Sequence, residues 1–149
     1  MALSISTDLK NYVLNQRVVK QMAGTNGTGG SAVLNIYCGS RPTSADAATA
    51  ATAGTLLARI INMGWNGTFG ATGGTAGLAT TGYTGTALTT GTATWARMET
   101  FGTGLTGSAA TYRVDGDVGT ASSNTFVINS PIITVGSMVT IVTNNISMG

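Results

Sequence analysis

Short strand-like segments separated by glycine-rich turns recur along most of this 149-residue chain. Thr is abundant and, being β-branched, favours strands, while the 22 glycines provide tight turns and close backbone approach. Recurrent short strands with turn residues between them are typical of antiparallel β-proteins. The sequence therefore predicts an all-β fold, a jelly-roll-like β-sandwich of about eight strands.

The strand predictions rest on alternating or continuously apolar segments bounded by Gly, Ser or Asn. Alternation places Leu57 on the same face as Arg59 and Ile61, and both faces of this segment are largely apolar. We therefore expect it to be buried or to lie at an interface. Gly116 is expected to interrupt its strand. The predicted strands are residues 33–37, 55–62, 92–99, 112–118, 124–129, 131–135 and 138–146.

An amphipathic helix is predicted for residues 7–22, where apolar side chains recur at three- and four-residue spacing. Thr7 or Asp8 is expected to cap its first turn, because a short side-chain oxygen there accepts a hydrogen bond from a free backbone amide. The sequence thus predicts two parts, an N-terminal helical arm over residues 1–24 and a β-sandwich domain over residues 25–149.

The apolar stripe of this arm, which includes Leu9, Tyr12 and Val13, has two interpretations. It packs against the chain's own β-domain, or it docks on a neighbouring subunit. Both interpretations use the same apolar face, so the sequence leaves them open. We predict these three residues as candidate interface residues.

Charged residues make up only 8% of the chain, against roughly 25% in an average soluble protein. A surface with so little charge repels its own copies weakly, which suits a protein that binds its neighbours. The 7 basic and 5 acidic residues form no basic run, so we expect no nucleic-acid partner. No apolar run approaches the roughly 20 residues of a membrane span, so we expect no membrane contact and no secretion signal.

The residue types that most enzymes use are scarce. The sequence contains no histidine, which removes the commonest general base and the commonest metal ligand. Cys38 is expected to be a buried thiol rather than a nucleophile. Asp115 and Asp117 are expected in a solvated turn or as partners of Arg97 or Arg113, because two carboxylates are too few for a calcium site. We therefore predict a non-enzymatic protein with no metal and no cofactor.

Residues 66–90 form a Gly, Thr and Ala tract with few large side chains, Phe69 among them. The tract either contains small-residue strands joined by wide loops or orders only against a neighbour, because little apolar burial offsets its chain entropy. Trp95 lies in a firm strand and is expected in the core, whereas Trp65, at a strand end, fits the core and an interface about equally. Trp65 and Phe69 are candidate interface residues.

Arg41, Pro42 and Asp46 belong to a predicted surface loop after the first strand, and we predict them as interface residues too. Pro42 favours extended backbone geometry at Arg41, because its ring clashes with a helical conformation of the preceding residue. The arm, this loop and the Gly/Thr tract are the three contact elements that we predict.

Several stretches of the chain resemble motifs of small virion proteins of tailed bacteriophages. Residues 34–46, LNIYCGSRPTSAD, are similar to the family's IYxGxxPxSAD stretch, and residues 54–58 match the GTLLA that follows it. The opening MALSISTDL resembles the family's start before a helix. Further likenesses lie in ARM at 96–98, DVGTASS at 117–123 and IITVGSMV at 132–139.

The resemblance implies a capsid decoration, or cement, protein with a jelly-roll-like β-fold. It implies binding to the major capsid protein and to itself, as a homotrimer, on the exterior of the capsid after synthesis in the cytoplasm of a bacterial host. A tail, collar or fibre component is the alternative, because such a protein would share the composition and the trimeric habit.

Overall fold

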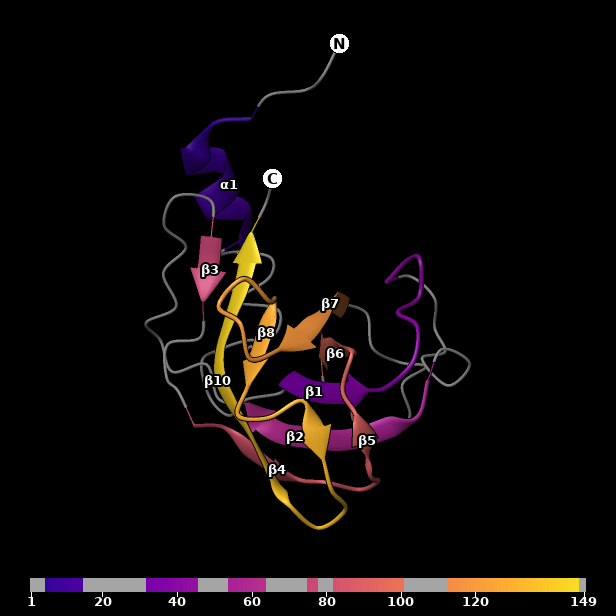
Figure 1. The fold of residues 1–149 in the computed structure, drawn as a ribbon. Helices are drawn as coiled ribbons and strands as arrows, with labels where there is room; N and C mark the ends of the chain where they lie inside the picture. Colours follow the sequence, from indigo (N-terminus) through magenta and orange to yellow (C-terminus); the bar gives the residue numbers. More distant parts are fainter. Residues whose placement is uncertain are drawn as a thin grey trace.

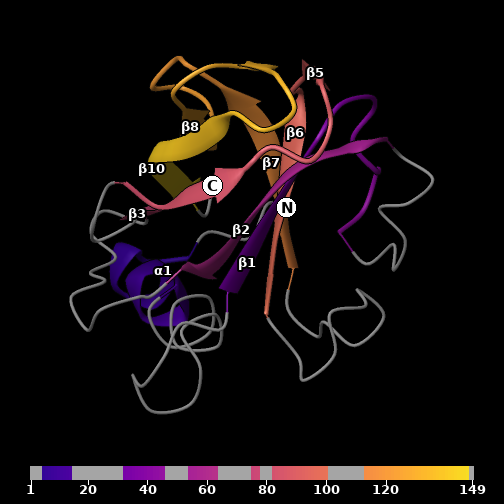
Figure 2. The ribbon, with the colours of Figure 1, turned by 90° about the horizontal axis from the view of Figure 1, so that it is seen from below.

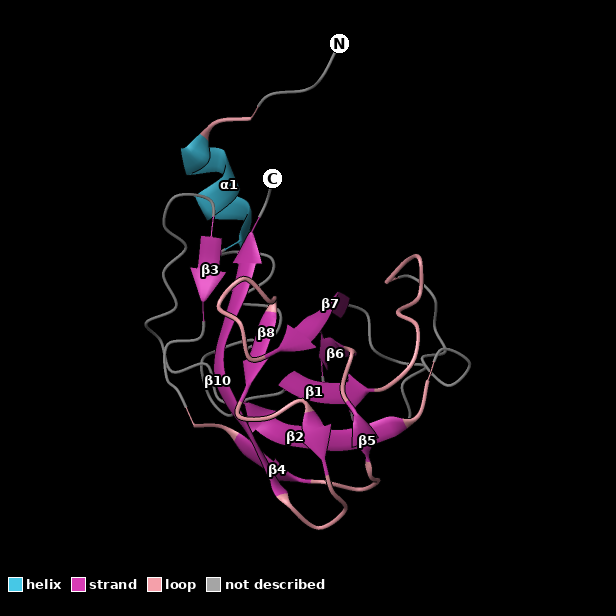
Figure 3. Ribbon diagram, in the orientation of Figure 1, coloured by secondary structure: helices cyan, strands magenta, loops and turns pink. Residues whose placement is uncertain are grey.

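The computed structural model describes residues 5–14, 32–45, 54–63, 75–77, 82–100 and 113–147. These residues form one short helix followed by strands, so the predicted all-β class is confirmed (Figures 1 and 3). The helix α1 spans Thr7–Val13. The strands are β1 (Ala32–Tyr37), β2 (Leu56–Met63), β3 (Thr75–Gly77), β4 (Thr84–Thr86), β5 (Gly91–Thr92), β6 (Trp95–Thr100), β7 (Arg113–Gly119), β8 (Phe126–Ile128), β9 (Ile132–Ile133) and β10 (Met138–Ser147).

One sheet contains most of these strands. Its order is β2-β1-β6-β7-β8-β10-β3, and β4 also pairs with β10. β7 and β8 run parallel, whereas the other paired strands of the described chain run antiparallel. β5 and β9 form a separate two-stranded sheet. Figure 2 shows the strands curving around a common interior.

The large sheet nearly closes on itself because the residues after β4 lie against β2. Ala87 forms an isolated bridge with Ala58 of β2. The amides of Leu88 and Thr89 both donate to the carbonyl oxygen of Leu57, at 2.7 and 3.2 Å. We call this contact between β2 and residues 84–89 the seam. It converts an open sheet into a barrel-like wall.

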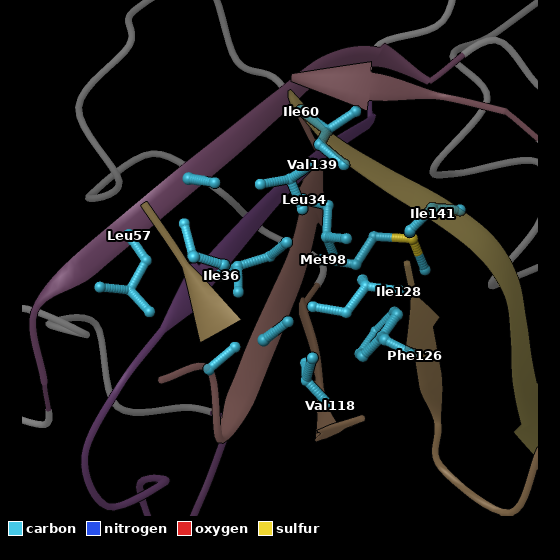
Figure 4. Packing of buried hydrophobic residues seen from close by; sticks show 14 of the residues in the cluster. Leu34, Ile36, Leu57, Ile60, Met98, Val118, Phe126, Ile128, Val139 and Ile141 are labelled. Carbon is cyan, nitrogen blue, oxygen red and sulfur yellow. The ribbon is translucent and has the colours of Figure 1, made fainter. Parts of the chain in front are cut away.

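The inner face of this wall is apolar and forms the core. Successive strand residues face opposite sides, so alternate side chains of β1 and β6 point inward, among them Leu34, Ile36 and Met98. Figure 4 shows them converging with side chains from β8 and β10. Full burial of each large apolar side chain stabilises the fold by about 1.5–3 kcal/mol. The labelled core residues are Leu34, Ile36, Leu57, Ile60, Met98, Val118, Phe126, Ile128, Val139 and Ile141.

Leu57 does not share the face of Arg59 and Ile61, so that prediction is wrong. The register between β1 and β2 pairs Ile36 with Ala58 but Tyr37 with Leu56, which leaves Leu57 as an extra residue in β2. Such a β-bulge breaks the two-residue alternation. Leu57 and Ala58 are consequently both buried in the core, while Ile61 remains exposed.

Gly116 does not interrupt its strand, contrary to the prediction, since β7 continues through it. The residue allows close packing instead. A Cβ atom at Gly116 would lie 2.5 Å from the Cβ of Thr125, which is too close for two carbon atoms. The glycine therefore lets the segment before β8 approach the inner face of β7.

Helix α1 begins at Thr7, as predicted, but its capping residue lies one position earlier than predicted. The side-chain oxygen of Ser6, rather than Thr7 or Asp8, accepts a hydrogen bond from the amide of Leu9 at 3.3 Å. The described helix ends at Val13 and is followed by the fully buried Leu14. Residues 15–22 of the predicted helix lie outside the described ranges. α1 contacts β3, at the end of the barrel where Figure 1 shows the two chain termini.

Candidate interaction surfaces

Helix α1 presents two exposed apolar side chains. Leu9 and Tyr12 are 48% and 63% exposed, whereas the predicted interface residue Val13 is only partly exposed. Leu14, which the predicted stripe did not include, anchors the helix to the body of the protein. We call Leu9 and Tyr12 the arm surface. Their exposure favours the interpretation in which this face meets another molecule.

A second apolar surface lies at the opposite end of the barrel. Four large side chains there are between 54% and 71% exposed, and we call them the apolar end: Leu88, Ile132, Val135 and Met138. They belong to the segment after β4 and to the connection from β9 into β10, which lies at the bottom of Figure 1, far from α1 at the top.

Backbone hydrogen bonds hold the segments of the apolar end together. The amide of Ala87 donates to the Ser137 carbonyl, and the amide of Gly136 donates to the Ala87 carbonyl, both at 2.9 Å. The amide of Val135 donates to the hydroxyl of Thr90 at 3.0 Å. Gly136 has a φ of 80°, a left-handed conformation that glycine adopts without steric cost. The exposed side chains therefore project from an ordered platform.

Charge is distributed unevenly between the ends and the faces of the molecule. No Asp, Glu, Lys or Arg occurs in residues 60–96 or in residues 118–149. The whole apolar end falls within these two stretches. The described charged side chains belong to α1, to the loop after β1, and to β2, β6 and β7.

The face of β2, β1, β6 and β7 that points away from the core is polar, and we call it the outer face. At its centre, Arg97 and Asp115 form a bidentate ion pair with both N–O distances at 2.7 Å. The two side chains are 2% and 7% exposed. This contact bears out one of the two predicted alternatives for Asp115, pairing with an arginine. Hydrogen bonding of the guanidinium to Asp115 raises the pKa of Arg97 further, so the guanidinium stays charged.

Asn35 links two further charges on the outer face. Its side-chain oxygen accepts from Arg59 Nε at 2.8 Å, and its amide nitrogen donates to Glu99 Oε1 at 2.8 Å. Burial raises the pKa of Glu99 despite the neighbouring arginines. Arg113 lies 3.9 Å from the second Glu99 oxygen. Cross-strand pairing of β2, β1, β6 and β7 produces this row of polar contacts.

Trp95 is buried, as predicted, but it lies on the outer face rather than in the core cluster. Its ring stacks on Tyr37, with the ring centroids 4.4 Å apart and the planes 13° from parallel. The Arg97 guanidinium carbon lies 6.0 Å from the Trp95 ring centroid. Burial, with a smaller effect from Glu99, raises the pKa of Tyr37. The stacked rings of Tyr37 and Trp95 thus lie next to Arg97, at one end of the row of polar contacts on the outer face.

Asp117 has a different role from Asp115, and it pairs with neither Arg97 nor Arg113 in the contacts described. One carboxylate oxygen accepts from the amide and hydroxyl of Thr125, at 3.1 and 2.7 Å, and the other accepts from the Asn124 side chain at 2.7 Å. The bond from Asn124, together with those from Thr125, lowers the pKa of Asp117 to about 2. Asp117 thereby fixes the short loop that returns the chain from β7 to its parallel neighbour β8.

Two predicted interface residues border hollows beside the outer face. Arg41 is exposed and Pro42 is partly exposed. Arg41 lines a pocket of about 260 Å³ together with Trp95 and Asp117, and a pocket of about 520 Å³ together with Pro42 and Asp115. Figure 1 shows the loop after β1 on the other side of the molecule from α1. The structure therefore does not bring Arg41 and Pro42 together with the arm surface.

The remaining predictions meet the structure only in part. Asp46, Trp65 and Phe69 lie outside the described residues, so their interface roles stay predictions. Cys38 is partly buried and packs against the core. The sequence reasoning missed the apolar end, because Ile132 and Met138 were assigned to strands without regard to exposure. The absence of charged residues from residues 60–96 and 118–149 was the sequence feature that could have indicated this surface.

Within the described ranges, no three His, Cys, Asp or Glu side chains gather as metal ligands would. None of the helical residues described makes a segment long and apolar enough to cross a bilayer. No protein-family model, curated protein or solved structure matches this chain.

Proposed function

We propose that this chain is a structural protein of a bacteriophage particle, a capsid decoration protein that binds the assembled shell and stabilises contacts between major capsid proteins. The observation that carries the proposal is the presence of exposed large apolar side chains at two opposite ends of a weakly charged barrel. A body with two separate contact surfaces is suited to bridging neighbours.

The proposed mechanism is binding without chemistry. A protein that binds the assembled shell, but not free subunits, shifts the assembly equilibrium towards the shell by mass action. Each exposed large apolar side chain that becomes buried contributes about 1–2 kcal/mol. Contacts of this modest strength add up when many linked copies bind together. In this proposal the arm surface, Leu9 and Tyr12, meets the major capsid protein on the exterior of the particle.

The motif resemblance supports the same proposal. Its longest part begins in β1 and continues through the exposed loop that carries Arg41 and Pro42. A surface loop is where a binding motif is accessible to a partner. The nearly closed all-β body is compatible with the jelly-roll-like fold that the resemblance implies, and the jelly-roll assignment and the homotrimer are part of the proposal.

Copy number in purified particles tests the proposed function. Particles are purified from a lysate of the phage that encodes the chain, and the chain is quantified against the major capsid protein by mass spectrometry. The proposal expects a copy number of the same order as that of the shell subunits. A few copies per particle would replace it with the tail, collar or fibre alternative, and absence from particles would overturn both.

Substitutions in the arm surface test the mechanism. Particles lacking the chain are mixed with purified protein, and bound protein is measured by co-sedimentation. Leu9→Asp with Tyr12→Asp should weaken binding at least about tenfold, because two charges then face an apolar partner. Thr7→Asp adds a charge at an exposed position of the same helix and should leave binding unchanged. Equal loss in both variants would contradict an apolar contact.

A further inference from the structure

We infer that the apolar end, Leu88, Ile132, Val135 and Met138, is the surface through which this chain binds a second copy of itself. The inference rests on the homotrimer of the proposed function, and it assigns self-contact to one end of the barrel and shell contact to the other. In an assembly of this kind, the apolar ends of neighbouring copies pack around a shared symmetry axis.

Exposure alone does not identify a partner, but these four side chains come from segments that backbone hydrogen bonds hold together. Single exposed apolar side chains are common on soluble proteins, whereas a contiguous group marks a contact site. Leu88 and Val135 are brought together by the hydrogen bonds between Ala87 and Gly136 and between Ala87 and Ser137. A platform that is ordered before binding loses little conformational freedom on association.

The absence of charge favours a second copy as the partner. In contact with its own kind, a charged side chain near the axis faces an identical charge, which is unfavourable. A different partner imposes no such restriction, because it can carry the opposite charge. The stretches that build the apolar end, within residues 60–96 and 118–149, contain no charged residue at all. A surface of this composition meets no like-charge repulsion in self-contact.

The arm surface provides the contrast within the same molecule. Leu9 and Tyr12 have Asp8 and Lys10 as neighbours on α1. Charges of both signs beside an apolar pair can be matched by a different protein with its own pattern of charges. This difference in charge is the one expected if the arm surface binds a different protein and the apolar end binds the apolar end of another copy.

The oligomeric state of the full chain in solution tests this inference. Sedimentation equilibrium is measured over roughly 1–100 μM protein, a range that covers micromolar dissociation constants. The wild-type chain should have a mass that is a multiple of the 14.9 kDa protomer. Ile132→Asp with Val135→Asp should raise the dissociation constant about 100-fold, because each charge then meets its equivalent across the contact. A monomeric wild-type chain throughout this range overturns the inference.

Matched controls separate this effect from general disturbance of the fold. Ile61→Asp and Val142→Asp place the same charge on exposed apolar residues outside the apolar end, and both should keep the wild-type mass. Circular dichroism and thermal unfolding of every variant establish that it is folded. If Ile61→Asp or Val142→Asp dissociates the oligomer while the apolar-end variant does not, the contact lies elsewhere and the inference is wrong.

Salt and particle binding complete the test. Association through an uncharged surface should change less than about threefold between 0.05 and 0.5 M NaCl, since screening acts only on charges. A steep loss of association with salt contradicts the inference. Self-association of a chain that is absent from particles leaves this inference standing and overturns the proposed function. Particle binding by a chain that is monomeric in solution overturns this inference together with the homotrimer, and leaves shell binding standing.

Discussion

Arg97 shows how strongly a single partner determines the state of a buried charge in this protein. Its side chain is almost inaccessible to solvent, and its guanidinium is matched by both carboxylate oxygens of Asp115. A buried ion pair contributes little compared with an apolar pair of the same volume, but removal of one partner leaves the other desolvated. The pair is therefore more important for specifying the outer face than for adding net stability.

Asp115→Ala is expected to lower the free energy of unfolding by about 3–5 kcal/mol, because Arg97 then loses its bidentate partner without regaining water. Urea denaturation at pH 7 measures the change. Replacement of both residues, with Arg97→Met and Asp115→Leu, should cost much less than the single substitution. A double variant as unstable as the single one would show that packing, rather than the unpaired charge, dominates.

Asp117 makes the stability of the β7–β8 loop depend on pH. Its pKa in the folded protein is about 2, whereas the unfolded chain has the ordinary, higher value of an aspartate. The unfolded state therefore binds a proton first as the pH falls. The contribution of Asp117 to stability is complete above about pH 4 and is lost as the pH drops towards 2.

The expected result is a carboxyl resonance of Asp117 that titrates near pH 2 in NMR spectra of the folded chain. Asn124→Ala removes the largest cause of the shift and should move that titration towards the ordinary value. The melting temperature of this variant should then fall less between pH 4 and pH 2 than that of the wild type. Titration of the wild-type Asp117 near pH 4 would contradict the assigned hydrogen bonds.

Among the elements, β4 depends on a glycine for its position at the seam. A Cβ atom at Gly85 would overlap the carbonyl oxygen of Arg59 in β2. The backbone of β4 can therefore approach β2 only because no side chain intervenes. Thr84 and Thr86, on either side, are exposed and face away from this contact.

Gly85→Ala is expected to push β4 from β2 and to destabilise the fold by about 1–3 kcal/mol, the usual cost of overpacking. Hydrogen exchange should accelerate at the amides of Leu88 and Thr89, which bond across the seam. Thr86→Ala, at the exposed neighbouring position, is the control and should change neither measurement. Unchanged exchange at Leu88 in the Gly85 variant would mean that the seam does not depend on close approach.

Sequence pattern predicted individual strands better than their pairing. The apolar runs that became β1, β2 and β10 were recognised, because their composition is local information. The bulge at Leu57 and the parallel β7–β8 pair were not, since both depend on which strand lies alongside. Asp117 illustrates the difference: its side chain holds the parallel return, but the sequence indicated only a polar turn.

At the scale of the whole molecule, the candidate surfaces were only half predicted. Leu9 and Tyr12 were recognised from helical spacing, and their exposure fits one of the two interpretations that the sequence left open. Ile132 and Val135 look like strand or core residues when read locally. Their exposure follows from the position of β9 and its turn at one end of the barrel, which only the assembled fold determines.

The strand that comes last in chain order among those described, β10, affects when the protein can fold during its synthesis. β10 pairs with β3, β4 and β8, so it joins three other strands of the wall. In a nascent chain these three strands lack their common partner until β10, which ends at Ser147, has been synthesised. Such long-range pairing slows folding and leaves apolar surface uncovered in the meantime. The wall can therefore close only after β10 has left the ribosome, and until then the uncovered apolar strands are a surface that chaperones can bind.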